Sequence, residues 1–111
     1  MTSVEVQDMD PQKVIEKIQD RVKDAKAFVT FDIDFVDPAY APGTGTPEVG
    51  GFTSAETLRF VRGLKGLNMI GFDVVEVLPA YDPSQITSLL AANIAYEFIS
   101  LIALNKKGAA C

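Results

Sequence analysis

Two aspartates, Asp32 and Asp34, close an apolar run and lead into a loop rich in glycine, proline and threonine, FDIDFVDPAYAPGTGTPEVGG at 31–51. If the run is a β-strand, its alternating side chains place both carboxylates on the same side, roughly 6.6 Å apart along the strand. Two carboxylates this close repel each other unless a cation lies between them. Hard oxygen ligands favour Mg²⁺, Ca²⁺ or Mn²⁺, so the pair predicts a metal site. The structural alternative is that Asp34 caps a turn and Asp32 accepts backbone hydrogen bonds.

The elements that must position this pair follow from the spacing of apolar residues and from helix-capping residues. Asp10 before Pro11 predicts the start of a helix, and Thr53 with Glu56 three residues later forms a capping-box pattern. The expected elements are helices at 11–24, from 53 to near 66 and from 82 to near 104, strands at 27–33 and 69–77, and a loop at 34–52. This α-β-α-β-α order predicts a parallel sheet in one domain that covers residues 1–111.

Two strands are too few for a complete parallel sheet, whose strands are normally covered on both faces. The last helix is apolar nearly all round, and the residues expected to face inward are Ile86, Leu89, Leu90, Ile94, Phe98, Leu101 and Ile102. Polar residues interrupt its apolar stretch, so we expect a buried helix rather than a membrane span. We therefore expect part of a larger α/β fold whose other strands are missing from this chain.

Composition argues against several classes of function. The chain has 48% hydrophobic residues, a net charge of −5 and no block of Lys or Arg, which makes nucleic acid and anionic membranes poor candidates for partners. It has no histidine, so it offers no imidazole base and no His metal ligand. The single cysteine, Cys111, cannot form an internal disulfide, which suits the reducing cytoplasm. The acidic N-terminus lacks the apolar segment of a signal peptide.

An Asp-x-Asp pair alone allows a second enzymatic interpretation. DIDFV at 32–36 also resembles the Asp-x-Asp-x-Thr/Val strand end of the haloacid-dehalogenase-like phosphatases. That resemblance implies Asp32 as nucleophile and Asp34 as general acid. It also requires a lysine and a serine or threonine at later strand ends, and 76–82 contains neither.

The loop after the pair carries a longer and more specific resemblance. TFDIDFVDPAYAPGTGTPEVGG at 30–51 closely resembles the ureohydrolase signature and departs from it at Thr30, where serine is usual. GFDVVEVLPAYDP at 71–83 resembles the family's next strand. The family includes arginase, agmatinase, formiminoglutamase and proclavaminate amidinohydrolase. The resemblance covers nearly all of the chain and implies a partial three-layer α/β/α, arginase-like fold that corresponds to the C-terminal portion of a full-length member.

The resemblance implies roles for four residues. The family hydrolyses guanidinium groups at a two-Mn²⁺ centre with a bridging hydroxide, where Asp32 would bridge both metals and Asp34 would ligate one. Glu76 matches the carboxylate that pairs with the substrate guanidinium, and Thr46 matches a threonine beside the substrate. Without the resemblance, Glu76 is more simply a solvated residue at a strand end, and Thr46 a hydroxyl that stabilises a turn. PGTGTPE at 42–48 is typical of agmatinases, which split agmatine into putrescine and urea in polyamine biosynthesis.

Two further ligand segments of the family, Asp-Ala-His-x-Asp and Gly-Gly-Asp-His, are absent from this sequence. Two carboxylates cannot hold a two-metal centre alone, so we expect the isolated chain to be inactive or nearly so. The expected partners are a guanidinium substrate and either a complementing chain or further copies of this chain, joined through the open sheet edge and apolar helix faces. The alternative from a different class is a non-catalytic oligomerisation module in which Asp32 and Asp34 are vestiges.

Overall fold

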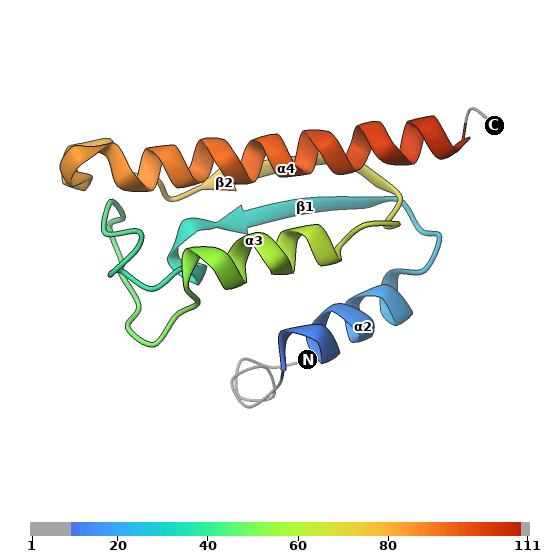
Figure 1. Ribbon diagram of the computed structural model, residues 1–111, viewed down its shortest axis with the longest axis horizontal. Helices are drawn as coiled ribbons and strands as arrows, with labels where there is room; N and C mark the ends of the chain where they lie inside the picture. The colour runs from blue at the N-terminus through green and yellow to red at the C-terminus, as the bar shows by residue number, and fades with distance from the viewer. Residues whose placement is uncertain (1–9, 110–111) are drawn as a thin grey trace.

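The computed structural model describes residues 10–109, and Figure 1 shows their arrangement. The elements are α2 (Pro11–Val22), β1 (Ala27–Asp32), a 3₁₀ turn (Ile33–Phe35), α3 (Ser54–Gly63), β2 (Met69–Val75), two further 3₁₀ turns (Pro79–Tyr81 and Pro83–Gln85) and α4 (Ile86–Ala109). The predicted α-β-α-β-α order is confirmed. Both strands end earlier than predicted, because a 3₁₀ turn begins at Ile33 and because Glu76 takes a left-handed backbone conformation with φ 66°.

Local capping interactions explain where the helices begin and end. Asp10 accepts a hydrogen bond from the first turn of α2, and Thr53 and Glu56 form both hydrogen bonds of the predicted capping box at α3. α2 is shorter than predicted because Lys23 leaves the helical region, with φ 49°. α4 begins at Ile86 rather than at 82, since a 3₁₀ turn precedes it.

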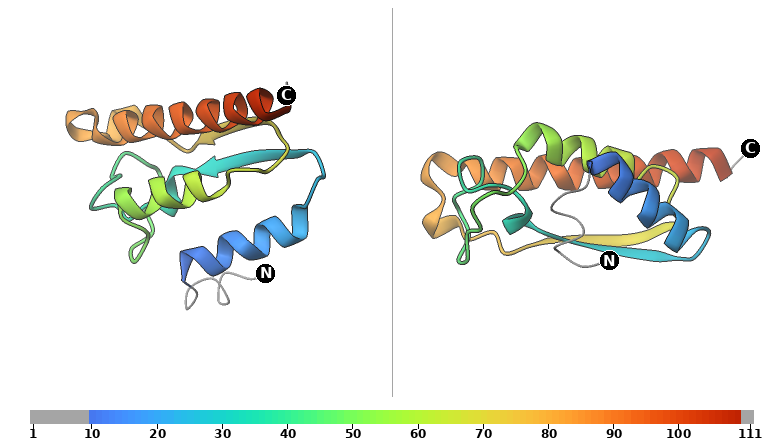
Figure 2. Two further views of the ribbon diagram at one scale, coloured as in Figure 1. Left: turned by 45° about the vertical axis from the view of Figure 1, so that its right-hand side comes forward. Right: turned by 90° about the horizontal axis from the view of Figure 1, so that it is seen from below.

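The sheet is parallel, as predicted, and the described residues give it two strands. In the register, Phe31 pairs with Val74 and Asp32 with Val75. Figure 2 shows α3 and α4 on one face of the sheet. Burial alternates along β1, and Phe28 on the uncovered side is 61% exposed. One covered face and one bare face are what an incomplete three-layer α/β/α fold would show.

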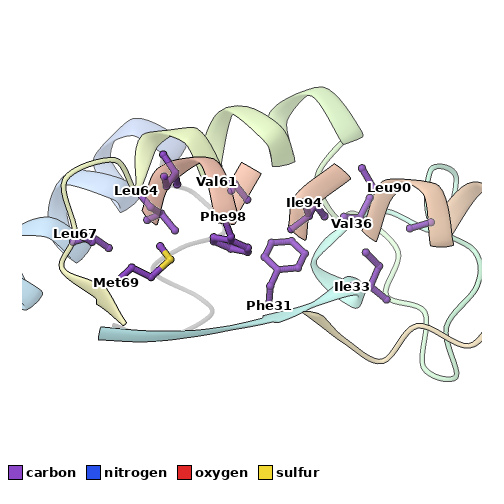
Figure 3. Close-up of a cluster of buried hydrophobic side chains, with 12 residues drawn as sticks. Phe31, Ile33, Val36, Val61, Leu64, Leu67, Met69, Leu90, Ile94 and Phe98 are labelled. Carbon is purple, nitrogen blue, oxygen red and sulfur yellow. The ribbon is translucent and has the colours of Figure 1, made fainter. Parts of the chain in front are cut away.

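The core lies between the sheet and the two covering helices (Figure 3). Phe98 of α4 is fully buried, stacks on Phe72 with ring centroids 5.0 Å apart, and meets the edge of Phe31. Other core residues come from the 3₁₀ turn, α3 and α4, namely Ile33, Val36, Val61, Leu90, Ile94 and Leu101. Phe31, Phe72 and Phe98 therefore form the centre of the core.

Of the α4 residues predicted to face inward, Ile86 and Leu89 do not. Leu90, Ile94, Phe98 and Leu101 face inward, but Leu89 is 70% exposed and Ile86 is 49% exposed. Their side of the helix is exposed because no element among residues 10–109 packs over it. By length and composition alone, Pro83–Gly108 could also cross a membrane. Its buried face packs on α3 and β2, which is the arrangement of a core helix.

Candidate metal-binding site

Asp32 and Asp34 do not share one strand, and that prediction is corrected by the structure. Asp32 is the last residue of β1 and is exposed, whereas Asp34 lies inside the 3₁₀ turn. The Asp32 carboxylate accepts a hydrogen bond from the backbone N–H of Asp34, at 2.9 Å, and so caps this turn. The capping role expected for Asp34 in the structural alternative therefore belongs to Asp32. The turn keeps both carboxylates at the carboxyl end of β1, where open α/β sheets bind ligands.

The carboxylate of Asp34 is held by two threonines of the long loop. The Thr44 hydroxyl donates to one carboxylate oxygen and the Thr46 hydroxyl donates to the other, the latter at 2.7 Å. Thr44 is buried and Thr46 is exposed. A carboxylate has about four lone-pair sites, so both oxygens keep capacity for a metal ion. The two hydroxyls fix the orientation of Asp34 in the way that outer hydrogen bonds orient metal ligands.

Asp37 closes the base of the same loop and forms a turn. Its carboxylate accepts hydrogen bonds from the backbone N–H groups of Ala39, at 2.8 Å, and Gly50, at 3.0 Å. Gly51 lies against this turn so closely that an added Cβ would be 2.7 Å from the Asp37 nitrogen. The loop is therefore fixed at both ends, and it returns to the turn that carries Asp34.

Glu76 stands at the same edge of the sheet. It follows Val75, the register partner of Asp32, and it is exposed. Its φ of 66° is uncommon for a residue other than glycine, and such conformations cluster at functional sites. The solvated strand-end residue and the substrate-pairing carboxylate are both compatible with this position, so the role of Glu76 stays a prediction.

The arrangement of these residues can be compared with that of known proteins. The family model described as the arginase family matches residues 1–100 of the chain. The chain belongs to the arginase family. A curated relative, agmatinase from Escherichia coli O9:H4 (strain HS), is 49% identical over 106 residues, which are 96% of this chain and 35% of the relative. The arginase-family chain thus spans about a third of the length of the curated relatives it matches.

Solved structures agree with this assignment and with the arginase-like fold predicted from the sequence. A hypothetical agmatinase from Burkholderia thailandensis has a TM-score of 0.86 and 49% identity, and the match covers 92% of this chain and 32% of that one. Proclavaminate amidino hydrolase from Streptomyces clavuligerus has a TM-score of 0.86 and 42% identity, with coverages of 93% and 34%. The family membership favours the ureohydrolase interpretation of Asp32 and Asp34 over the phosphatase one.

The donor set of the arginase-family chain suits a hard divalent cation but supplies only part of its coordination. Asp32 and Asp34 offer carboxylate oxygens, the ligands that Mn²⁺ and Mg²⁺ accept. Among residues 10–109, neither aspartate forms an ion pair with Lys or Arg, so neither charge is already neutralised there. Across the same described range, no three acidic, His or Cys residues are grouped to hold a metal ion. A metal ion held by these two carboxylates would need further ligands from outside the described residues.

Sequence reasoning missed three residues that support this site, namely Thr44, Asp82 and Thr87. The repeat of Gly-Thr in GTGTP would have indicated Thr44, because it precedes Thr46 by two residues. Asp82 was expected to cap the last helix but not to contact the loop. Thr87 gave no signal, since a buried threonine in a helix is usually a packing residue.

Asp82 makes the free energy of unfolding of the arginase-family chain depend on pH in the acidic range. Burial opposes its ionisation, but hydrogen bonds from the side chains and backbone of Ser88 and Thr87 outweigh this and lower its pKa from 3.8 to about 2. Because the folded pKa is below the unfolded one, this stabilisation is complete above pH ~4 and is lost as the pH falls toward 2. We expect the free energy of unfolding to decline over that interval, and to decline less in Asp82→Asn, as measured by urea denaturation at stepped pH. Parallel pH profiles for the two proteins would contradict this.

Proposed function

We propose that this chain supplies carboxylate ligands and the guanidinium-binding carboxylate of a two-manganese ureohydrolase site that converts agmatine to putrescine and urea. The observation that carries the proposal is the Asp34 carboxylate, gripped by Thr44 and Thr46 beside Asp32 at the carboxyl end of β1. The two threonine hydroxyls fix the orientation of this carboxylate. A metal ligand needs a fixed orientation, whereas a solvated turn residue does not.

Each residue has a role in this proposal. Manganese, when bound, would acidify a water molecule so that it attacks the guanidinium carbon at neutral pH. Asp32 and Asp34 would both serve as carboxylate ligands of the metal centre. Glu76 would pair with the planar, fork-shaped guanidinium, whose geometry suits a carboxylate. Thr46, at the exposed end of the loop, would lie beside the substrate while it holds Asp34.

The substrate assignment rests on the relatives and on the loop sequence. Curated relatives that are 49% identical to this chain are called agmatinases, and PGTGTPE at 42–48 has the agmatinase form. Agmatine has one guanidinium for Glu76 and one amine at its far end. We propose agmatine as the substrate of the whole protein, as a step of polyamine biosynthesis in the cytoplasm.

We propose that the 111-residue chain alone is inactive and needs a complementing chain or further copies of itself. The sequence has no histidine, and the two carboxylates leave a two-metal centre short of ligands. The uncovered face of the sheet and the exposed side of α4 carry Phe28, Ile70, Leu89, Tyr96 and Ile99. Apolar residues gathered on open faces in this way are typical of an interface. Nucleic acid and membranes are not among the proposed partners.

The experiment that tests the proposal is a chimera. The matching 106 residues of the Escherichia coli agmatinase would be replaced by those of this chain, and urea release from agmatine would be measured with added Mn²⁺. We expect turnover by the chimera and none by the isolated chain. A folded chimera that binds Mn²⁺ but releases no urea would overturn the proposed function. Turnover by the isolated chain would overturn the proposal that it is inactive.

A further inference from the structure

The loop that holds Asp34 is pinned to the first turn of α4 at a single glycine. The backbone N–H of Gly43 donates to the Thr87 hydroxyl at 2.8 Å, and the Gly43 carbonyl accepts a hydrogen bond from the N–H of Leu78 at 2.8 Å. Gly43 is buried and Thr87 is fully buried. Water cannot replace the Thr87 hydroxyl at such a depth, so the Gly43 N–H depends on this one side chain for its hydrogen bond.

The first turn of α4, which carries Thr87, is in turn held by Asp82. The Asp82 carboxylate accepts hydrogen bonds from the backbone N–H groups of Thr87, at 2.8 Å, and Ser88, at 2.9 Å, and from the Ser88 hydroxyl at 2.7 Å. These bonds fix the first turn of α4 to the segment that follows β2. The loop after β1 and the segment after β2, which carries Glu76, thus share one anchor.

No side chain fits between the loop and this anchor. A Cβ added at Gly43 would lie 2.5 Å from the Asp82 Cβ and 2.9 Å from the Thr87 hydroxyl oxygen. The backbone of the loop therefore packs directly against the start of α4, and no space remains between them for a side chain. Thr44 is the next residue, one peptide unit of about 3.8 Å away, and its hydroxyl holds Asp34. A displacement of Gly43 therefore also moves Thr44 and the hydroxyl that holds Asp34.

We infer that Thr87 is a positioning residue for the Asp34 carboxylate, acting through Gly43 and Thr44. The inference deepens the proposed function and rests on it only for the part that concerns metal. Thr87 touches neither Asp34 nor a substrate. Its hydroxyl accepts a hydrogen bond from the loop at Gly43 and so fixes how closely the loop packs on α4. The next residue of the loop, Thr44, donates a hydrogen bond to Asp34. The anchor belongs to α4, so the orientation of a residue after β1 is set by a helix 53 positions further along the chain.

The test compares Thr87→Val with Thr57→Val in the full 111-residue chain. Both threonines are fully buried, and the Thr57 hydroxyl donates within α3 to the carbonyl of Thr53, at 2.8 Å, away from the loop. Valine keeps the shape and removes the hydroxyl in each case. The readouts are amide hydrogen exchange, resolved by residue, and the affinity for Mn²⁺ measured from paramagnetic broadening of NMR signals.

In Thr87→Val we expect exchange at Gly43 and Thr44 to be at least ~10-fold faster relative to the rest of the chain, and Mn²⁺ binding to be several-fold weaker. Thr87→Ser keeps the hydroxyl and should resemble the wild type. Thr57→Val should lower the thermal midpoint without either local effect. Should Thr87→Val not fold, Asp82→Asn, which weakens the hydrogen bonds that hold the turn carrying Thr87, is expected to change both readouts in the same direction.

Unchanged exchange at Gly43 and Thr44 in Thr87→Val, or an equal change in Thr57→Val, would overturn the inference. Failure of the proposed function is separate and visible in the wild type. If the wild-type chain binds no Mn²⁺ at Asp34, the metal site is refuted, while the exchange comparison still decides whether Thr87 positions the loop. Thr44→Val adds a directional check, because it should weaken Mn²⁺ binding and leave exchange at Gly43 slow.

Discussion

Urea release from agmatine by the chimera is expected to fall by more than ~100-fold when Asp34 is replaced by asparagine. Loss of an outer hydrogen-bond partner of a metal ligand typically costs 10–100-fold, and the loss of a charged ligand should exceed that. Asparagine keeps the size of the side chain, and its single oxygen can still accept from either Thr44 or Thr46. The defect should therefore appear in metal affinity and in kcat rather than in folding.

The matched control is Asp20→Asn, the same chemical change at an exposed position of α2. It should leave urea release and Mn²⁺ affinity at the values of the unmodified chimera. Circular dichroism of both variants establishes that the comparison is between folded proteins. Retention of more than about a tenth of the activity by Asp34→Asn would show that this carboxylate is not a metal ligand.

The largest effect on stability is expected from Phe98→Ala. Phe98 is fully buried, stacks on Phe72 and meets the edge of Phe31, so its truncation leaves a cavity at the centre of the core. Phe-to-Ala changes at such sites cost about 3–5 kcal/mol of the free energy of unfolding. Domains have only about 5–15 kcal/mol in total, so the variant should lose a large fraction of its free energy of unfolding.

Tyr96→Ala tests the same helix on its other side. Tyr96 is 68% exposed, and its replacement should change the free energy of unfolding by no more than about 0.5 kcal/mol in the monomer. Urea denaturation followed by circular dichroism measures both variants. Equal losses of unfolding free energy in the two variants would mean that α4 does not pack on the sheet through the side that carries Phe98. A concentration-dependent loss in Tyr96→Ala alone would instead place that residue in an interface between copies.

The order of the elements could be predicted because each carries a local signal. Apolar spacing defines α2 and α3, and the Thr53–Glu56 capping box places the start of α3 at the residue observed. The ends of the strands were harder to predict from the sequence. β1 stops at Asp32 because its own carboxylate caps a 3₁₀ turn, an interaction that apolar alternation does not reveal.

The candidate site residues could be named from the sequence, whereas their arrangement could not. Asp32 and Asp34 stand out by type, but strand alternation gave the wrong geometry, because the turn removes Asp34 from the strand. Thr44 and Thr87 act through contacts across 10 and 44 positions of the chain. Contacts at such separations depend on tertiary packing, which a single sequence does not encode in any local pattern.

Ile86 and Leu89, near the start of α4, show a second feature that the sequence alone did not predict. Ile86 and Leu89 were expected inside because the helix is apolar nearly all round, and both are exposed. Hydropathy reports that a surface is suited to burial, but it does not identify the chain that buries it. Their exposure fits a fold that shares its core with further polypeptide.

Where Mn²⁺ binds on the 111-residue chain is the most direct test of the metal site. Isotope-labelled protein would be titrated with substoichiometric Mn²⁺, and the loss of each amide signal would be followed by NMR. We expect the signals of 32–34 and 44–46 to broaden first, and Asp32→Asn to remove that preference. No selective broadening at these residues, or the same broadening in Asp32→Asn, would contradict the assignment of Asp32 and Asp34 as metal ligands.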